Sequence, residues 1–162
     1  MELWDVVDRD RQKTGKTMVR GGTSPENGYH VVVHICVFNA KGDILIQQRQ
    51  PFKEGWPNKW DITVGGSAVT GDSSQTAAER ELFEELGLKL DLSHMRPHLT
   101  INFKHGFDDY YLIETEVDLD SLQLQYEEVQ RVKWATKNEI MEMIDQGAFI
   151  PYHKCLVELL FD

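Results

Sequence analysis

One segment limits what this chain can fold into more than any other. A glycine-rich stretch, Gly66–Asp72, is followed after seven further residues by Arg-Glu-Leu-Phe-Glu-Glu-Leu-Gly-Leu at 80–88. The apolar spacing predicts a helix over 73–86, and the glycine that follows is its expected C-terminal stop. We expect Asp72 to cap the N-terminus, with Gln75 at the third helical position completing a capping box.

The predicted helix concentrates carboxylates on one face. At 100° per residue, Glu84 and Glu85 lie about 60° and 40° to either side of Glu81. Glu81 and Glu85 form a like-charge i,i+4 pair that costs about 0.2–0.5 kcal/mol. The negative end of the helix dipole also disfavours the two glutamates of the last turn. The adjoining face is apolar and is expected to point to the core: Leu82, Phe83 and Leu86.

Arg80 offsets only part of this unfavourable charge. A helix that keeps like-charged neighbours and acidic residues in its last turn without a stabilising partner indicates a functional site. A divalent cation would supply the compensation, because Mg²⁺ is held by a few carboxylates plus substrate phosphates. The structural alternative is a solvated acidic helix face. The chain has 17 Lys and Arg against 27 Asp and Glu, a net charge of −10, so its overall field cannot attract a diphosphate. Metal ions would have to neutralise the phosphates locally.

The segment resembles the signature of the Nudix family, Gly-x5-Glu-x7-Arg-Glu-x-x-Glu-Glu-x-Gly. The match runs over 66–88 and departs from the pattern at one fixed position, where Asp72 replaces the first Glu. The resemblance implies Mg²⁺ or Mn²⁺ as cofactor and hydrolysis of a diphosphate linkage in a nucleoside diphosphate derivative or a related small molecule.

The resemblance also assigns roles to individual residues. It makes Glu84 and Glu85 metal ligands and Glu81 a ligand or the base that activates water. Arg80 would orient the glutamates. The Gly65 carbonyl would complete the metal shell. Asp72, one methylene shorter than Glu, is expected to reach the metal through water or only to cap the helix.

The expected fold class is α/β: a Nudix-like α/β/α sandwich, with a mixed β-sheet between helices, formed by residues 1–162 as a single domain. An N-terminal hairpin and loop should occupy 1–28, with strands at 3–8 and 17–20 and a turn at 14–16. Further strands are expected at 30–38, 43–49, 60–64, 97–104, 109–117 and 129–134. Two further helices are expected at 136–146 and 152–161.

Composition excludes several classes of partner. The acidic balance argues against nucleic acid, for which a basic patch is the usual footprint. No apolar run approaches a membrane span, and the N-terminus does not have the pattern of a signal peptide.

Cys36 and Cys155 match no metal or redox spacing and are expected to be buried thiols in a cytoplasmic protein. The N-terminal hairpin and exposed apolar surface are compatible with a homodimer.

Substrate contacts are expected outside the acidic helix. Arg49 and Lys53 could contact phosphates, or could simply be exposed. Trp60, like Trp56, could stack on a base, although anchoring in the core or a loop is the preferred interpretation. His30 and His34 are expected to fill space or form hydrogen bonds on their strand, with a metal-ligand role as the minor alternative for His30. A further carboxylate could come from one of four downstream residues, with the second pair preferred: Asp108 or Asp109, and Glu127 or Glu128.

A second resemblance gives an alternative activity. The run 30–42 and the pair Trp56 and Trp60 resemble isopentenyl-diphosphate isomerase, a Nudix-fold enzyme that uses a Cys-x-His arrangement after the second Trp. Gly65 and Ser67 occupy those two positions here, so isomerase chemistry is disfavoured. A non-catalytic, nucleotide-binding Nudix fold is the other alternative, but its expected signature is a degraded motif. The sequence therefore favours a metal-dependent hydrolase.

Overall fold

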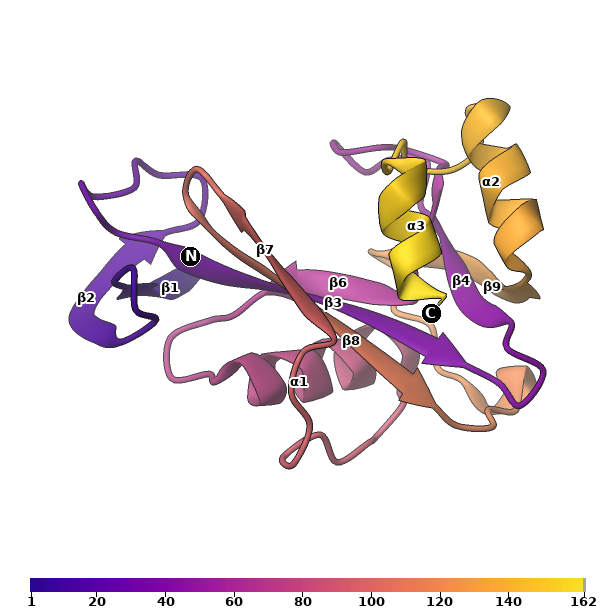
Figure 1. The fold of residues 1–162 in the computed structure, drawn as a ribbon, viewed down its shortest axis with the longest axis horizontal. Coiled ribbons are helices and arrows are strands. Elements are labelled where there is room, and N and C mark those ends of the chain that lie inside the picture. The colour runs from indigo at the N-terminus through magenta and orange to yellow at the C-terminus, as the bar shows by residue number, and fades with distance from the viewer. Residues whose placement is uncertain (162) are drawn as a thin grey trace. The chain divides into compact units, whose positions relative to one another are not determined.

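The computed structural model describes residues 1–161, and the chain forms two compact units. Unit 1 contains Met1–His34, Gly65–Glu81 and Leu90–Tyr111. Unit 2 contains Ile35–Val64, Leu82–Lys89 and the chain from Leu112 onward. Strands β3 and β8 and helix α1 each contain residues of both units. Figure 1 labels these elements on the ribbon.

The N-terminal hairpin is present, but its turn is not where we predicted it. Strands β1 (Leu3–Val7) and β2 (Lys13–Val19) pair antiparallel, so the turn lies between them and not at 14–16. The Asp8 carboxylate accepts hydrogen bonds from the backbone N–H groups of Asp10 and Gln12, both at 2.9 Å. This Asx-type turn reverses the chain early, and Arg11 has a left-handed φ of 65° within it.

The other strands of unit 1 belong to the main sheet. Strand β6 (Val64–Ser67) pairs with β3 (His30–Phe38), and β7 (Leu99–Phe103) pairs antiparallel with β8 (Gly106–Glu114). The predicted strand at 30–38 is confirmed. Strand β8 begins three residues earlier than predicted, because the tight turn after β7 starts the return strand at once.

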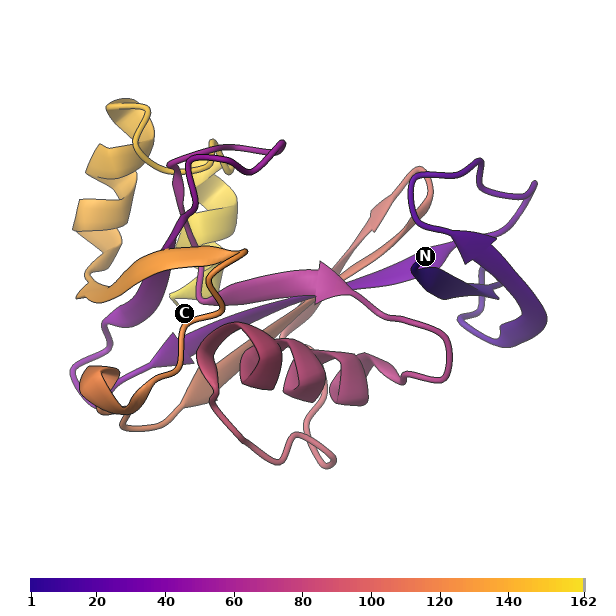
Figure 2. The same ribbon diagram turned by 180° about the vertical axis from the view of Figure 1, so that it is seen from behind.

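In unit 2, strand β4 (Ile44–Arg49) pairs antiparallel with β5 (Trp60–Asp61) and with β9 (Val129–Ala135). A 3-10 turn at Leu119–Ser121 was not predicted. Helices α2 (Lys137–Asp145) and α3 (Lys154–Leu160) agree with the two predicted C-terminal helices and lie against each other (Figure 2). The seven-stranded sheet has the order β5-β4-β3-β8-β7, with β6 on β3 and β9 on β4. The predicted α/β class is confirmed.

The predicted strand at 60–64 is interrupted, with β5 ending at Asp61 and β6 starting at Val64. The buried Thr63 hydroxyl provides the reason, since it accepts from the Val37 N–H at 2.9 Å and donates to the Leu45 carbonyl. A side chain thus takes backbone partners that a continuous strand would have used. Strand β6 includes Gly65 and also Gly66, the first residue of the glycine-rich stretch.

Helix α1 (Ser74–Leu86) begins one residue later than predicted and has a different cap. The Ser73 hydroxyl accepts from the Thr76 N–H at 3.1 Å, and the Thr76 hydroxyl accepts from the Ser73 N–H at 2.8 Å. This reciprocal pair replaces the predicted Asp72 and Gln75 capping box. The C-terminal stop at Gly87 is confirmed, with a φ of 67°.

Two burial predictions are wrong. Leu82 and Leu86 are fully buried as expected, but Phe83 is 59% exposed because it lies on the outer side of α1. Cys36 is fully buried, and burial raises the pKa of its thiol, whereas Cys155 is exposed on α3. Among residues 1–161, no helix has the length and apolar character that a membrane span requires.

Candidate functional site

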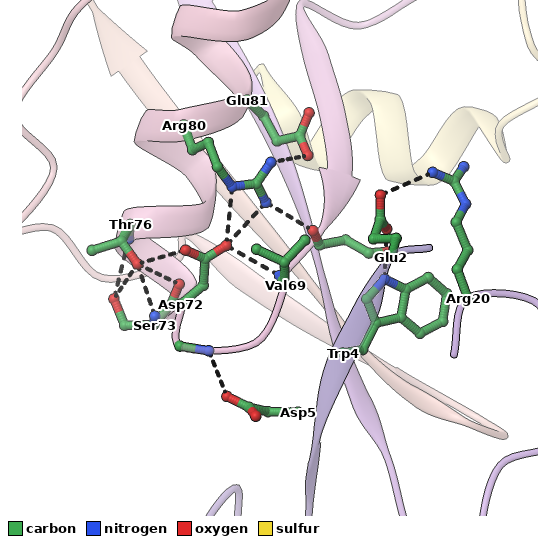
Figure 3. A network of polar contacts seen from close by, with 12 residues as sticks. Glu2, Trp4, Asp5, Arg20, Val69, Asp72, Ser73, Thr76, Arg80 and Glu81 are labelled. Carbon is green, nitrogen blue, oxygen red and sulfur yellow. Dashed lines mark hydrogen bonds and ion pairs between the residues drawn. The ribbon is translucent and has the colours of Figure 1, made fainter. Parts of the chain in front are cut away.

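Arg80 holds two carboxylates of unit 1, those of Asp72 and Glu81 (Figure 3). Its guanidinium donates to Asp72 Oδ2 from Nε at 3.2 Å and from Nη2 at 2.9 Å. It also donates to Glu81 Oε1 at 2.9 Å and to the Ser67 carbonyl at 3.0 Å. Burial alone would lower the pKa of Arg80, but the hydrogen bond and charge of Asp72 and the charge of Glu81 outweigh it and raise the pKa. The guanidinium therefore stays charged and fixes both acids.

Asp72 joins the turn before α1 to this network instead of capping the helix. Besides Arg80, its carboxylate accepts from the Val69 N–H at 3.1 Å. The next residue along the turn, Gly71, donates its N–H to Asp5 of β1 at 2.9 Å. The turn is thereby held at both ends by carboxylates of unit 1.

Gly66 allows Glu81 to approach strand β6. A Cβ at Gly66 would lie less than 3.0 Å from the carboxyl group of Glu81. The φ of Gly66 lies outside the left-handed region, so the position needs glycine for space and not for backbone conformation. The sequence showed a glycine at this position but not which side chain approaches it.

In unit 2, Glu85 is buried and Glu84 is exposed. The Glu85 carboxylate accepts from Gln47 Nε2 of β4 at 2.7 Å, and the same amide donates to the Thr63 carbonyl at 3.2 Å. A buried carboxylate needs such a donor. Sequence reasoning did not identify Gln47, which is 38 residues from Glu85; its only signal was a polar side chain in a buried strand.

The donors of α1 and its preceding turn have the chemistry of a hard-cation site. The segment has four carboxylates, Asp72, Glu81, Glu84 and Glu85, and the guanidinium of Arg80 pairs with the first two. Oxygen ligands with excess negative charge fit Mg²⁺ or Mn²⁺. Among residues 1–161, no three His, Cys, Asp or Glu side chains converge as metal ligands. Protein donors engage Glu81 and Glu85. The residues fit the ion by their chemistry.

Two downstream aspartates are engaged elsewhere in unit 1. His34 Nε2 lies 2.9 Å from Asp108 Oδ1 and donates to that carboxylate in the tautomer with a hydrogen on Nε2, and the His34 ring stacks on Tyr110 with centroids 4.4 Å apart. His34 is therefore a hydrogen-bonding partner. A Cβ at Gly65 would lie 3.3 Å from Nδ1 of the His34 ring.

Asp109 is fully buried within a network of four donors. Arg11 holds both of its oxygens, with the Nη1 contact at 2.9 Å, and Thr100 donates at 2.6 Å. Ser74, the first residue of α1, donates at 2.6 Å and contacts the Tyr111 hydroxyl at 2.7 Å. Burial alone would raise the pKa of Asp109, but these hydrogen bonds hold it below its usual value. Asp109 thus anchors the start of α1.

Comparison with known proteins identifies the family. The model of the NUDIX domain matches residues 28–155, most of the chain. The chain belongs to the Nudix family. It is 49% identical over 152 residues to an uncharacterized Nudix hydrolase of Listeria monocytogenes, covering 94% of this chain and 90% of that protein. This Nudix chain also shares its fold with the crystal structure of DR0079 from Deinococcus radiodurans, with a TM-score of 0.79 and 22% identity over 99% of this chain and 100% of that one.

The resemblance to the isomerase branch of the Nudix fold is also confirmed. The isopentenyl-diphosphate Delta-isomerase of Salmonella arizonae is 27% identical over 133 residues, which cover 76% of this chain and 71% of the isomerase. At the two positions where the resemblance expects the isomerase Cys and His, this Nudix chain has Gly65 and Ser67 in β6. Cys36, on β3, is fully buried and its pKa is raised.

The three predicted substrate contacts of this Nudix chain already have protein partners in unit 2. Arg49 Nε donates to the Gly55 carbonyl at 2.8 Å, and the Lys53 ammonium lies 2.7 Å from Glu128. Trp60 is only 8% exposed, and two cations lie over its ring: Arg131 at 5.5 Å and Lys133 at 4.8 Å from the centroid. The geometry favours anchoring for Trp60. Glu127 is exposed on the segment that precedes β9.

Proposed function

We propose that this Nudix protein is a metal-dependent hydrolase that cleaves the diphosphate linkage of a nucleoside diphosphate derivative. The observation that carries the proposal is the Glu81 carboxylate, which Arg80 holds at 2.9 Å against a glycine of strand β6. Such an arrangement positions an acid where a side chain at Gly66 would exclude it. The proposed setting is a cytoplasmic enzyme with a small-molecule substrate, and a homodimer is the proposed assembly.

In this proposal each residue has a separate task. Glu84 and Glu85 hold the cation, and Glu81 is a further ligand or takes the proton of the attacking water. A bound Mg²⁺ or Mn²⁺ would neutralise phosphate charge and lower the pKa of water. Gln47 orients Glu85 through the 2.7 Å hydrogen bond, as donors behind metal ligands commonly do. Arg80 orients Glu81 through its 2.9 Å hydrogen bond.

The test compares Glu85→Gln with wild type under a titration of Mg²⁺ or Mn²⁺ against a panel of nucleoside diphosphate derivatives. Loss of one ligand charge should lower kcat/KM at least about 100-fold, each tenfold corresponding to about 1.4 kcal/mol of barrier. The fold should be retained, because Gln47 can donate to a glutamine carbonyl as well. EDTA should abolish the wild-type activity.

The matched control is Glu158→Gln, which removes one exposed carboxylate from α3. It should leave kcat/KM and the metal requirement unchanged. Full wild-type activity in EDTA, or an unaffected Glu85→Gln variant, would contradict the proposal. Turnover of isopentenyl diphosphate in place of hydrolysis would favour the isomerase.

A further inference from the structure

Two exposed aromatic rings contact each other in unit 2. Phe52 is 55% exposed and Tyr126 is 70% exposed, although their ring centroids are 5.6 Å apart with an interplanar angle of 39°. Large exposed apolar side chains are ordinary when they are scattered singly. These two are neighbours from segments 74 positions apart in the sequence, and each still presents most of its surface to solvent.

The Phe52–Tyr126 pair is held by paired strands. Strand β4 ends at Arg49, opposite Val129 at the start of β9, so the loops that carry the two rings leave the sheet at one place. The Gln50 N–H donates to the Glu128 carbonyl at 3.2 Å, and Lys53 forms its 2.7 Å ion pair with the Glu128 carboxylate. Backbone and side-chain contacts therefore fix both loops relative to each other.

The Tyr126 loop is also bonded to the carboxylate end of α1. The Gln125 N–H donates to the Glu85 carbonyl at 2.9 Å, and the Gln123 N–H donates to the Leu86 carbonyl at 2.9 Å. Tyr126 directly follows the residue that is bonded to Glu85. The aromatic pair is thus tied to the helix end that carries Glu84 and Glu85, within the same unit.

We infer that Phe52 and Tyr126 form a stacking surface for the planar base of the substrate, while its diphosphate lies at the carboxylates of α1. The inference rests on the proposed function and extends it to the nucleobase. Every nucleobase has a π-face, so aromatic stacking contributes affinity with little preference for one base over another. Lys53, adjacent to Phe52 and paired with Glu128 at 2.7 Å, places a cation beside the two loops that carry the rings.

The experiment measures binding without turnover. Isothermal titration calorimetry with Mg²⁺ compares methylenediphosphonate, which has no base, with the α,β-methylene analogues of ADP, GDP, CDP and UDP. The variants are Phe52→Ala, Tyr126→Ala and Tyr126→Phe, with Leu159→Ala as control because Leu159 is 50% exposed on α3. Thermal melts check that each variant is folded.

For the nucleotide that binds wild type best, Phe52→Ala and Tyr126→Ala should each raise Kd about tenfold. Tyr126→Phe and Leu159→Ala should leave Kd unchanged, and no variant should alter the Kd of methylenediphosphonate. Equal Kd values for wild type and both alanine variants with all four nucleotides would overturn the inference, as would an equal loss of methylenediphosphonate affinity. Because no hydrolysis is read, an inactive enzyme that still shows the base-dependent loss would refute only the proposed function.

Discussion

At the scale of single residues, Arg80 is a cation that the structure places among the carboxylates of the acidic motif. Its guanidinium donates to Asp72, to Glu81 and to the Ser67 carbonyl. These groups come from a turn, a helix and a strand. A planar guanidinium has a rigid fork of donors that can satisfy several acceptors at once, whereas an ammonium is a point charge on a flexible stem. The shape of Arg80 therefore matters in addition to its charge.

Arg80→Lys tests this role, since it keeps the charge and removes the fork. We expect kcat/KM to fall about tenfold or more, because Glu81 is no longer held against β6. KM should change less than kcat if Arg80 acts through Glu81 and does not contact substrate. Steady-state kinetics with the substrate found in the panel measure both.

Arg20→Lys is the matched control for that substitution. Arg20 pairs with Glu2 at 3.4 Å but is 68% exposed, so its replacement should leave the kinetics unchanged. Equal effects of the two substitutions would show that Arg80 has no special position. Complete rescue by lysine would show that charge alone is sufficient.

The residues of the motif could be predicted from the sequence because they are neighbours on one helix. Their spacing fixes which of them share a face, whatever the rest of the chain does. Partners that the tertiary fold supplies could not be predicted in this way. Gln47 approaches Glu85 from another element, and Arg11 reaches Asp109 from 98 residues away.

At the scale of elements, strand β6 and helix α1 approach each other closely within unit 1. The contact is possible because Gly66 has no side chain where the Glu81 carboxyl lies. The neighbouring Ser67 contributes its carbonyl to Arg80 at 3.0 Å. The strand thus provides both the space and one acceptor for the acidic site.

Gly66→Ala should separate activity from stability. The added Cβ would lie less than 3.0 Å from the Glu81 carboxyl, the far end of a flexible side chain, so Glu81 should move and the backbone should not. We expect kcat/KM to fall at least about tenfold, since displacement of a reacting group by about 1 Å can cost 100-fold. The melting temperature should change little. Kinetics and a thermal melt provide the two measurements.

Gly55→Ala is the control, because a Cβ there would meet only the Arg49 guanidinium at 3.8 Å. It should be neutral in both assays. A Gly66→Ala variant with wild-type activity would mean that Glu81 need not lie against β6. Unfolding of the variant would mean that the contact is structural.

Local signals placed most elements correctly and failed where side chains replaced backbone partners. Helix α1 lies within one residue of its prediction, yet Ser73 and Thr76 form the cap in place of Asp72, whose carboxylate is taken by Arg80. Thr63 divides the strand predicted at 60–64. In both cases a tertiary contact outcompetes a local preference, and a single sequence does not contain that contact.

At the scale of the whole molecule, stability depends on buried polar groups as well as on the apolar core. His30 is 9% exposed and stacks on Trp4 with centroids 4.3 Å apart. Its Nδ1 has no hydrogen-bond partner among residues 1–161. A buried polar atom left unsatisfied costs about 1–3 kcal/mol. The groups that act on its charge are the backbone of His105, the Asp108 carboxylate and the His105 ring.

Burial lowers the pKa of His30, and it outweighs the His105 backbone contact and the Asp108 charge, which act in the opposite direction. Because the folded-state pKa lies below the unfolded value of about 6.5, the unfolded chain binds more protons as the pH falls through that value. The contribution of His30 to the free energy of unfolding is therefore fully present above pH ~6.5. It is lost as the pH falls toward the folded-state pKa, by at most about 1.4 kcal/mol per pH unit.

The variant His30→Phe keeps an aromatic ring on Trp4 and removes both the titration and the unsatisfied atom. We expect the variant to be at least as stable as wild type at pH 7, and its advantage to grow between pH 6.5 and 5. Urea unfolding at each pH gives the free energies. Parallel curves for the two proteins would show that His30 does not titrate differently on folding, and a large loss at pH 7 would show that its ring nitrogens are satisfied in the folded protein.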